Sequence, residues 1–495
     1  MAEAKLYGQN KGGTSINGII KDYYAYAGEN ISAGDLVEYI NGVAGKVDYG
    51  ESVDTQLSDV EKSGRTISAV ALGENRVFVA YSYSADLYLY GVVVTIDGAT
   101  ITYGSDKKLS TTNYTGFAIS AIRLKENKVF IAHSHTNGYQ LYGMLCTITD
   151  STIKVETDIE LASNNYQGYY ISALALDENR VFIAHDYHSN DYLYGIVVTI
   201  DGTTITKGTD TSIHSSPYTS TRRSMCLLPN GNVFIAHSSG SSYQLYGTLV
   251  SISNTTITKK TVTELSTESN SGNNISVCLL PNGNVFIAHG YGSSYYLYGV
   301  VCSVSGTTIT KGSDTLLANS ANAGKVISCE LLPNGKVFIA RSGGTYSYLL
   351  STVVNIDNTT ITIDSDTALT DTSNTNNRYT GYAISSLLLA NGTIFVAHSK
   401  TDSYYLNAQV FGIDYENNIP TNQISITEYE TQVRQVTTGQ FDGVAKTSGT
   451  GGDDTGHNDK VGIYTLVPTQ EMTMADGNIL ADANGDIFLV REEIA

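Results

Sequence analysis

The residues with the clearest potential for chemistry follow the recurring sequence VFIA. Five of the seven positions after it are histidines: Tyr81, His133, His185, His237, His289, Arg341 and His398. Imidazole nitrogens are common zinc ligands, but zinc binds them at about 2 Å. The seven copies of this sequence belong to repeated units. If those units are arranged in a ring, equivalent strands of neighbouring units lie roughly 10 Å apart, given the spacing of strands within a sheet. We therefore predict structural hydrogen bonds between repeat units at this position, with neither a metal nor a cofactor.

The VFIA sequence belongs to a repeat that covers most of the 495 residues. Its phenylalanine recurs seven times, with five spacings of 52 residues and a last spacing of 57: Phe78, Phe130, Phe182, Phe234, Phe286, Phe338 and Phe395. A repeat of this length indicates one supersecondary unit copied in tandem.

One copy, residues 66–109, contains four runs rich in Val, Ile, Tyr and Thr, each bounded by turn residues. This pattern is typical of four antiparallel strands, and no stretch has a helical period. Seven four-stranded units predict an all-β fold, a seven-bladed β-propeller, which leaves only short sheet edges exposed. A β-solenoid is the alternative, but its coils are shorter and lack the four-strand grouping.

The chain outside the repeats suggests how the ring closes. Leu57 precedes Ile67 by the same ten residues that separate Leu109 from Ile119, so residues 46–57 are in phase with an outermost strand. We predict a propeller over 45–415, with 46–57 completing blade 7; residues 424–433 are the rival for that place. The flanks 1–44 and 416–495 are each too short to bury a core, so we expect them to form one composite β-domain.

Charge and hydropathy limit the partners. The chain has 29 basic and 48 acidic residues, a net charge of -19, and no basic cluster larger than Arg222 and Arg223. This argues against nucleic acid, which requires a Lys/Arg footprint. The first residues lack the apolar core of a signal peptide, and no apolar run is long enough to insert into a membrane. We expect synthesis and assembly in the cytoplasm.

The connections between strands are of two kinds. On one face of the predicted propeller, similar short hairpins such as DGTT and PNGN recur from blade to blade. The links on the opposite face are longer and differ between blades. Tyrosines among Asn, Ser, Thr and Gly on the varied face offer flat rings and adaptable hydrogen bonds, which suit sugars or protein epitopes. The candidate ligand-binding residues are Tyr83, Tyr139, Tyr187, Tyr243, Tyr291 and Tyr295 in one loop set, and Tyr114, Tyr166, Tyr218 and Tyr379 in the other.

Catalysis has little support in the sequence. Glycosidases need two positioned carboxylates, but the acidic residues of the repeats lie mostly in hairpins and outer strands. The chain has no sialidase-type S-x-D-x-G-x-T-W repeat, no GxSxG, no HExxH and no phosphate loop. We predict that the protein is not an enzyme and has no catalytic residues.

The flanks and the repeat resemble known modules. The pair ISAGDLVEYING and FDGVAKTSGTGG…VGIYT is similar to terminal β-modules of tailed-phage and prophage virion proteins, and ISALALDENRVFIAHDY…YLYGIVVTIDGTTIT resembles propeller repeats in such proteins. The resemblance implies a virion component of the head-surface (capsid decoration) or tail-fibre (receptor-binding) type. Its composite domain would be the attachment base and its propeller the displayed head.

Three functions remain open on these grounds. The first is a non-enzymatic virion structural protein that binds a phage capsid or tail protein, further copies of itself and a host-surface glycan or protein. The second is a secreted or surface propeller lectin unrelated to phage. The third is a glycan-cleaving enzyme, which paired carboxylates in one pocket would support.

Overall fold

The computed structural model describes residues 20–27, 36–435, 443–445 and 460–466, apart from 59, 62, 74, 84–85, 126, 188–191, 217–222, 273, 375–376, 402 and 415–417; side chains are described between residues 49 and 424. The chain forms two compact units, one of residues 48–426 and one of residues 1–47 with 427–495. Within the described part, no helix has the length and apolar character needed to cross a membrane.

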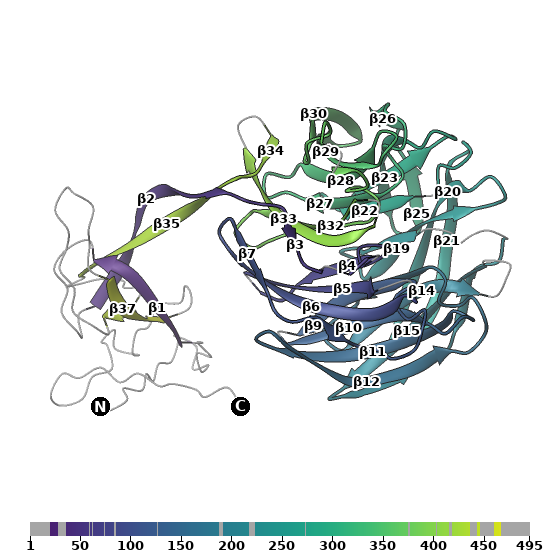
Figure 1. Cartoon of the computed structure of the whole chain (residues 1–495), viewed down its shortest axis with the longest axis horizontal. Helices are drawn as coiled ribbons and strands as arrows, with labels where there is room; N and C mark the ends of the chain where they lie inside the picture. Colours follow the sequence, from purple (N-terminus) through teal and green to yellow (C-terminus); the bar gives the residue numbers. More distant parts are fainter. Residues whose placement is uncertain are drawn as a thin grey trace. The chain divides into compact units, whose positions relative to one another are not determined.

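Residues 48–426 form the predicted seven-bladed β-propeller, in which seven antiparallel sheets follow one another around a ring (Figure 1). Blade 1 contains β4 (Ile67–Ala71), β5 (Arg76–Tyr83), β6 (Tyr88–Asp97), β7 (Thr100–Tyr103) and β8 (Lys107–Lys108). Blade 2 contains β9 (Ile119–Lys125), β10 (Lys128–His135), β11 (Gln140–Thr149) and β12 (Thr152–Ala162). Blade 3 contains β13 (Ile171–Ala175), β14 (Arg180–Tyr187), β15 (Tyr192–Asp201), β16 (Thr204–Lys207) and β17 (Thr211–His214).

The remaining blades repeat this order from the innermost to the outermost strand. Blade 4 contains β18 (Arg223–Leu227), β19 (Asn232–Ser239), β20 (Gln244–Ser253) and β21 (Thr256–Ser266). Blade 5 contains β22 (Ile275–Leu279), β23 (Val285–Tyr291), β24 (Tyr296–Ser305), β25 (Thr308–Lys311) and β26 (Thr315–Ala318). Blade 6 contains β27 (Ile327–Leu331), β28 (Val337–Gly343), β29 (Tyr348–Asp357) and β30 (Thr360–Ala368). Blade 7 contains β31 (Ile384–Leu388), β32 (Ile394–Lys400) and β33 (Tyr405–Asp414), together with β34 (Ile419–Thr421) and β3 (Thr55–Gln56).

The second strand of each blade is buried on both faces. In β10, Phe130 has no exposed surface, and its ring packs against Gly143 of the neighbouring strand. The packing is close, since a Cβ at Gly143 would lie 2.8 Å from the Phe130 ring. Its neighbours Val129 and Ile131 join a different core cluster, shared with blade 1. Alternate residues of one strand therefore face two adjacent blades, which explains the continuous apolar sequence.

Serines of the innermost strands link the blades. The second residue of all seven innermost strands is serine, and in six of them its Oγ accepts a hydrogen bond from the backbone N–H of the next blade. Six such bonds, 2.9 to 3.1 Å long, join Ser68 to Ala121, Ser120 to Ala173, Ser224 to Val277, Ser276 to Cys329, Ser328 to Ser386 and Ser385 to Ala69. The last of them crosses from blade 7 to blade 1.

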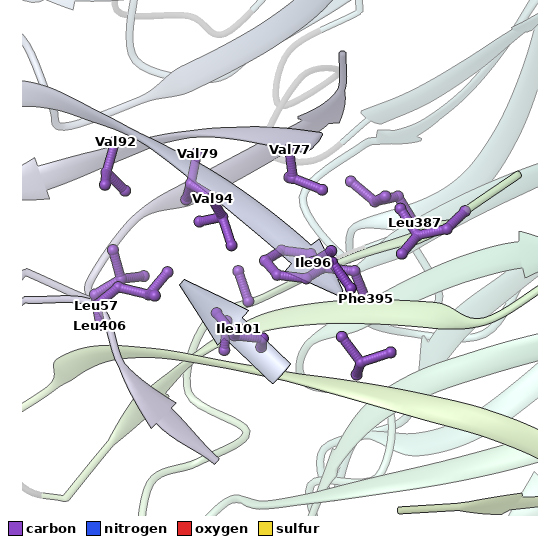
Figure 2. Packing of buried hydrophobic residues seen from close by; sticks show 14 of the residues in the cluster. Leu57, Val77, Val79, Val92, Val94, Ile96, Ile101, Leu387, Phe395 and Leu406 are labelled. Carbon is purple, nitrogen blue, oxygen red and sulfur yellow. The ribbon is translucent and has the colours of Figure 1, made fainter. Parts of the chain in front are cut away.

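Two separated segments complete the outermost strand of blade 7. Thr55 and Gln56 of β3 pair with β33, and β34 pairs with the other end of β33. Thr55 and Gln56, within the predicted segment 46–57, thus provide one half of this strand, whereas residues 46–51 belong to β2 (Leu36–Glu51). The IPT sequence of β34 provides the other half without any trace of the repeat. Figure 2 shows Leu57 beside Leu406 in the core cluster that blades 7 and 1 share. Blades 1, 3 and 5 have the same broken outermost strand, made there from consecutive residues.

The other unit is a small closed barrel. Its strands are β1 (Ile20–Ala27), β2 (Leu36–Glu51), β35 (Gln423–Gln435), β36 (Gly443–Ala445) and β37 (Lys460–Leu466), in the order β1-β35-β2-β36-β37. Both ends of the chain contribute strands to it. Residues 424–433, the alternative candidate for closing the ring, lie in β35, where Gln432 and Val433 pair with β1 of this barrel.

Candidate functional site

The loop face is the face that carries the links between blades and the links between second and third strands. The sequence predicted that this face varies from blade to blade. The structure shows that the same two turns recur wherever these links are described, although the link between blades 6 and 7 is five residues longer than the others. In blade 2, the Gly168 N–H donates to the Tyr139 carbonyl at 2.5 Å and the Tyr166 N–H donates to the Gly138 carbonyl at 2.8 Å. Gly116, Gly272, Gly324 and Gly381 donate equivalent bonds of 2.6 to 2.7 Å.

Both turns place a residue in the left-handed region of backbone space. Tyr139 has φ of 52° and Tyr166 has φ of 69°. The position equivalent to Tyr166 is asparagine in two other blades, at Asn270 and Asn322, with φ of 63° in both. Asparagine adopts this conformation more readily than most residues, whereas a bulky aromatic residue there is uncommon. A tyrosine held in such a turn costs conformational energy, and retained strain of this kind is found preferentially at functional sites.

The glycine of the turn is required by close packing. A side chain on Gly168 would place its Cβ 2.4 Å from the Gln140 carbonyl oxygen, and one on Gly116 would lie 2.6 Å from the Tyr88 carbonyl oxygen. The turn glycine brings the link between blades against the link between strands. The residue after it then lies two residues before the first residue of the innermost strand of the next blade.

The structure separates the ten predicted tyrosines into groups. Three of them, at the end of the second strand, stack on a recurring tyrosine of the third strand: Tyr83 on Tyr90 at 3.9 Å, Tyr187 on Tyr194 at 4.1 Å, and Tyr291 on Tyr298 at 4.1 Å between ring centroids. One face of each ring is therefore covered within its own blade. Tyr218 lies outside the described residues.

The other six occupy the turns with positive φ: Tyr114, Tyr139, Tyr166, Tyr243, Tyr295 and Tyr379. Tyr379 contacts Tyr404 edge-on, with 5.7 Å between ring centroids. Tyr243 and Tyr295 share the positive-φ turn with the rest of the group. The remaining three converge at blade 2.

These three belong to an aromatic cluster of five side chains, Tyr114, Phe117, Tyr139, Tyr166 and Tyr169. Tyr139 is at its centre, with ring centroids 4.6 Å from Phe117, 5.2 Å from Tyr169, 5.8 Å from Tyr114 and 6.1 Å from Tyr166. Phe117 and Tyr169 are 4.9 Å apart. Tyr166 is 43% exposed and the other four are half-buried. Burial, with the neighbouring tyrosines, raises the pKa of Tyr139, so its hydroxyl stays protonated and can donate.

Sequence reasoning missed Phe117 and Tyr169. Each directly follows the turn glycine, in NYTGF and NYQGY. The signal was present as an aromatic residue after a recurring glycine, but it becomes meaningful only once the paired turns are known. The arrangement provides apolar ring faces bordered by phenol hydroxyls, which is the chemistry needed to hold the C–H face and the hydroxyls of a sugar ring.

The histidines after VFIA are structural. In blade 2, His133 Nδ1 lies 2.6 Å from the Ser134 carbonyl oxygen, and Nε2 lies 3.0 Å from Asp158 Oδ1 on the outermost strand. The prediction that these histidines bond between blades was wrong, because their hydrogen bonds join strands within one blade and the serines described above link the blades. Both ring nitrogens lie within hydrogen-bond distance of protein oxygens, so neither is open to a metal ion. No group of His, Cys, Asp or Glu among the described residues could hold a metal ion.

No protein-family model matches the chain, and no curated protein matches it in sequence. Solved structures match in fold. A protein from Lactobacillus plantarum is 14% identical, with a TM-score of 0.51, over 73% of this chain and 99% of its own. A candidate 6-phosphogluconolactonase from Bacteroides fragilis is 10% identical, with a TM-score of 0.52, over 74% of this chain and 99% of its own. At these identities the likeness concerns the fold alone.

Proposed function

We propose that the protein is a non-enzymatic, saccharide-binding β-propeller whose binding site is the aromatic cluster of blades 1 to 3. The single observation that carries the proposal is the convergence of five aromatic rings on the loop face, three of them held in turns of positive φ. Surface tyrosines scattered at random would not share one contact network. A loop that only faced solvent could form this turn with asparagine, as Asn270 and Asn322 do, and would not require a bulky ring there.

The chemistry of the surrounding loops fits this ligand class. Residues 110–118, 136–139 and 163–170 contain no charged side chain, in a chain with 16% charged residues. They consist of Tyr, Phe, Asn, Gln, Ser, Thr, Gly and Ala. Tyrosine loses little conformational entropy on binding, and Asn and Ser supply adaptable hydrogen bonds. A saccharide needs both, because each sugar ring has an apolar face and a hydroxyl rim.

A saccharide array with the full chain tests the proposal. Tyr166→Asn removes the most exposed ring and keeps a residue that the chain itself uses in this turn, so the backbone is retained. The matched control is Tyr103→Ala, because Tyr103 is 49% exposed but lies on the outermost strand of blade 1. Binding that is lost in Tyr166→Asn and kept in Tyr103→Ala supports the site. Release of sugar by the purified protein would refute the non-enzymatic part.

The resemblance to virion proteins supports a setting for this function, and that setting rests on the sequence alone. We propose that the barrel unit attaches the chain to a phage capsid or tail protein and that the propeller carries the saccharide site. Mass spectrometry of purified particles tests this setting. Particles that lack the chain, from cells that produce it, would contradict it without affecting the saccharide site.

A further inference from the structure

The residues that follow the turn glycines form a second level of organisation on the loop face. Each lies two residues before the first residue of an innermost strand, and the innermost strands of neighbouring blades contact one another around the axis of the ring. Five of these residues are described. In ring order from blade 6 to blade 3 they are Lys325, Tyr382, Arg65, Phe117 and Tyr169. We call them the axial set.

The shared backbone fixes these positions. Phe117, Tyr169, Lys325 and Tyr382 each donate a backbone hydrogen bond of 3.1 to 3.2 Å to the residue three positions earlier. Arg65 follows Gly64, whose N–H donates to the Tyr404 carbonyl at 2.6 Å, as the other turn glycines do in their blades. Arg65 therefore occupies the same structural position as Phe117 and Tyr169.

Side chains at neighbouring positions of the axial set are close enough to touch, since the rings of Phe117 and Tyr169 lie 4.9 Å apart. The loop of Arg65 also lies against Phe117, because Thr66 Oγ1 donates to the Phe117 carbonyl at 3.2 Å. On its other side, Arg65 follows Tyr382 of blade 7 in ring order. The positive charge of Arg65 reaches the aromatic cluster, where it partly opposes the rise in the pKa of Tyr139.

The charge of this region contrasts with that of the whole chain. The protein has a net charge of -19, yet the axial set contains two cations and no acidic residue. Both side chains are exposed, and neither is among the ion pairs found between described residues. Glu61 lies four residues before Arg65, in the middle of the loop between β3 and β4. Two exposed cations interleaved with three aromatic rings are suited to an anion that carries an apolar face.

We propose that the axial set recognises an anionic saccharide, with its acidic group bound by Arg65 and Lys325 and its sugar rings placed on Tyr382, Phe117 and Tyr169. This inference rests on the proposed function and specifies its ligand class. The guanidinium of Arg65 offers a planar fork that matches a carboxylate through two parallel hydrogen bonds. Lys325 offers a point charge on the far side of Tyr382. The charge-free loops of blade 2 leave no carboxylate there to repel the ligand.

Calorimetric titration with trigalacturonate and with its methyl ester separates the charge of the ligand from its shape. The full chain binds the acid at least about tenfold more tightly than the ester, since one charge-assisted hydrogen bond corresponds to about that factor. Arg65→Gln weakens binding of the acid by about tenfold or more and abolishes the preference for the acid. The control Lys260→Gln makes the same change in net charge on the outermost strand of blade 4 and keeps the preference. A parallel titration with 3′-sialyllactose and lactose extends the comparison to a second acidic sugar.

The outcomes distinguish this inference from the proposed function. If acid and ester bind equally and Tyr166→Asn weakens both, the anionic specificity is wrong and the saccharide site stands. If Arg65→Gln keeps the full preference for the acid, the axial set is not the anion site. If a polyglutamate peptide binds more tightly than any saccharide and is lost in Arg65→Gln, the ligand is an acidic polypeptide and the saccharide class is wrong.

Discussion

Asp54 provides the sharpest test of how the ring is closed. It lies at the repeat position of Asp158, but it reaches blade 7 from the N-terminal side of the ring. Its carboxylate lies 3.2 Å from His398 Nε2 and 2.6 Å from Lys400 Nζ, and it accepts a hydrogen bond of 3.0 Å from Asn407 Nδ2. All three partners belong to β32 and β33. We call the junction between residues 52–57 and blade 7 the seam. It is therefore held by the Asp54 carboxylate as well as by the backbone hydrogen bonds of β3.

The perturbation is Asp54→Ala. The change leaves His398, which is fully buried, and Lys400 without their carboxylate. Removing one member of a buried ion pair costs about 3–5 kcal/mol, and we expect about 3 kcal/mol because the Asp54 side chain is 16% exposed. Asp158→Ala is the matched control. It removes the equivalent partner of His133 from a blade whose four strands are continuous in sequence.

Two measurements compare the variants, and the second distinguishes them. Urea unfolding gives the loss of stability, which we expect to be of similar size in both. Hydrogen exchange at Leu57, whose amide donates to the Leu406 carbonyl at 2.8 Å, reports on the seam itself. Exchange at Leu57 becomes faster than global unfolding in Asp54→Ala and stays close to global unfolding in Asp158→Ala. Unchanged protection of Leu57 in Asp54→Ala would refute the role of this residue in closure.

Asp54 also limits the stability of the ring closure at low pH. Burial alone would raise the pKa of Asp54, but His398 and Lys400 outweigh burial and hold its pKa well below the ordinary value of 3.8. A carboxyl with a lowered pKa contributes stability that is present above its unfolded pKa and is lost as the pH falls below it. Protection of Leu57 should therefore decline below about pH 4 in the wild type. In Asp54→Ala that dependence should be absent.

Three further substitutions test other parts of the account. Ser120→Ala leaves the Ala173 N–H without its inter-blade acceptor and should cost about 1–2 kcal/mol in urea unfolding; an unchanged midpoint would mean that water replaces the serine. Gly168→Ala should cost about 1–3 kcal/mol because of its contact with the Gln140 carbonyl, whereas Gly73→Ala, with open space around its Cβ, should be near neutral. Burial raises the pKa of Glu330 to about 8, so its stability contribution is lost as the pH rises from its ordinary pKa towards 8. Glu330→Gln should then be more stable than the wild type by a margin that grows between pH 5 and pH 8, and a margin that does not change with pH would contradict the buried neutral carboxyl.

The blades could be predicted from the sequence because each is a local unit. Four strands and their hairpins lie within 52 residues, and apolar strands with turn residues specify them without reference to the rest of the chain. The inter-blade serines were also readable, since all seven innermost strands have serine at the second position. Their role was assigned instead to the histidines, which are more familiar as functional groups and which bond within the blade.

The seam and the site were harder to predict because they depend on contacts between distant segments. The IPT sequence of β34 has no repeat character, so only its pairing with β33 reveals half of the last strand. The paired turns hold Tyr166, Asn270 and Asn322 in one conformation, and these side chains have no common chemistry that would indicate a common backbone. Phe117 and Tyr169 stood outside the predicted set for the same reason. Their importance comes from two turns meeting across blades.

The central claim is that the aromatic cluster on the loop face binds a saccharide. Its most direct test is a calorimetric titration of the best array saccharide into the full chain and into Tyr166→Asn. We predict one site per chain in the wild type and a loss of about tenfold or more in affinity in Tyr166→Asn, since a stacked aromatic ring contributes about 0.5–1.5 kcal/mol beyond the area it buries. Equal affinity in the two proteins, with the turn intact, would contradict it.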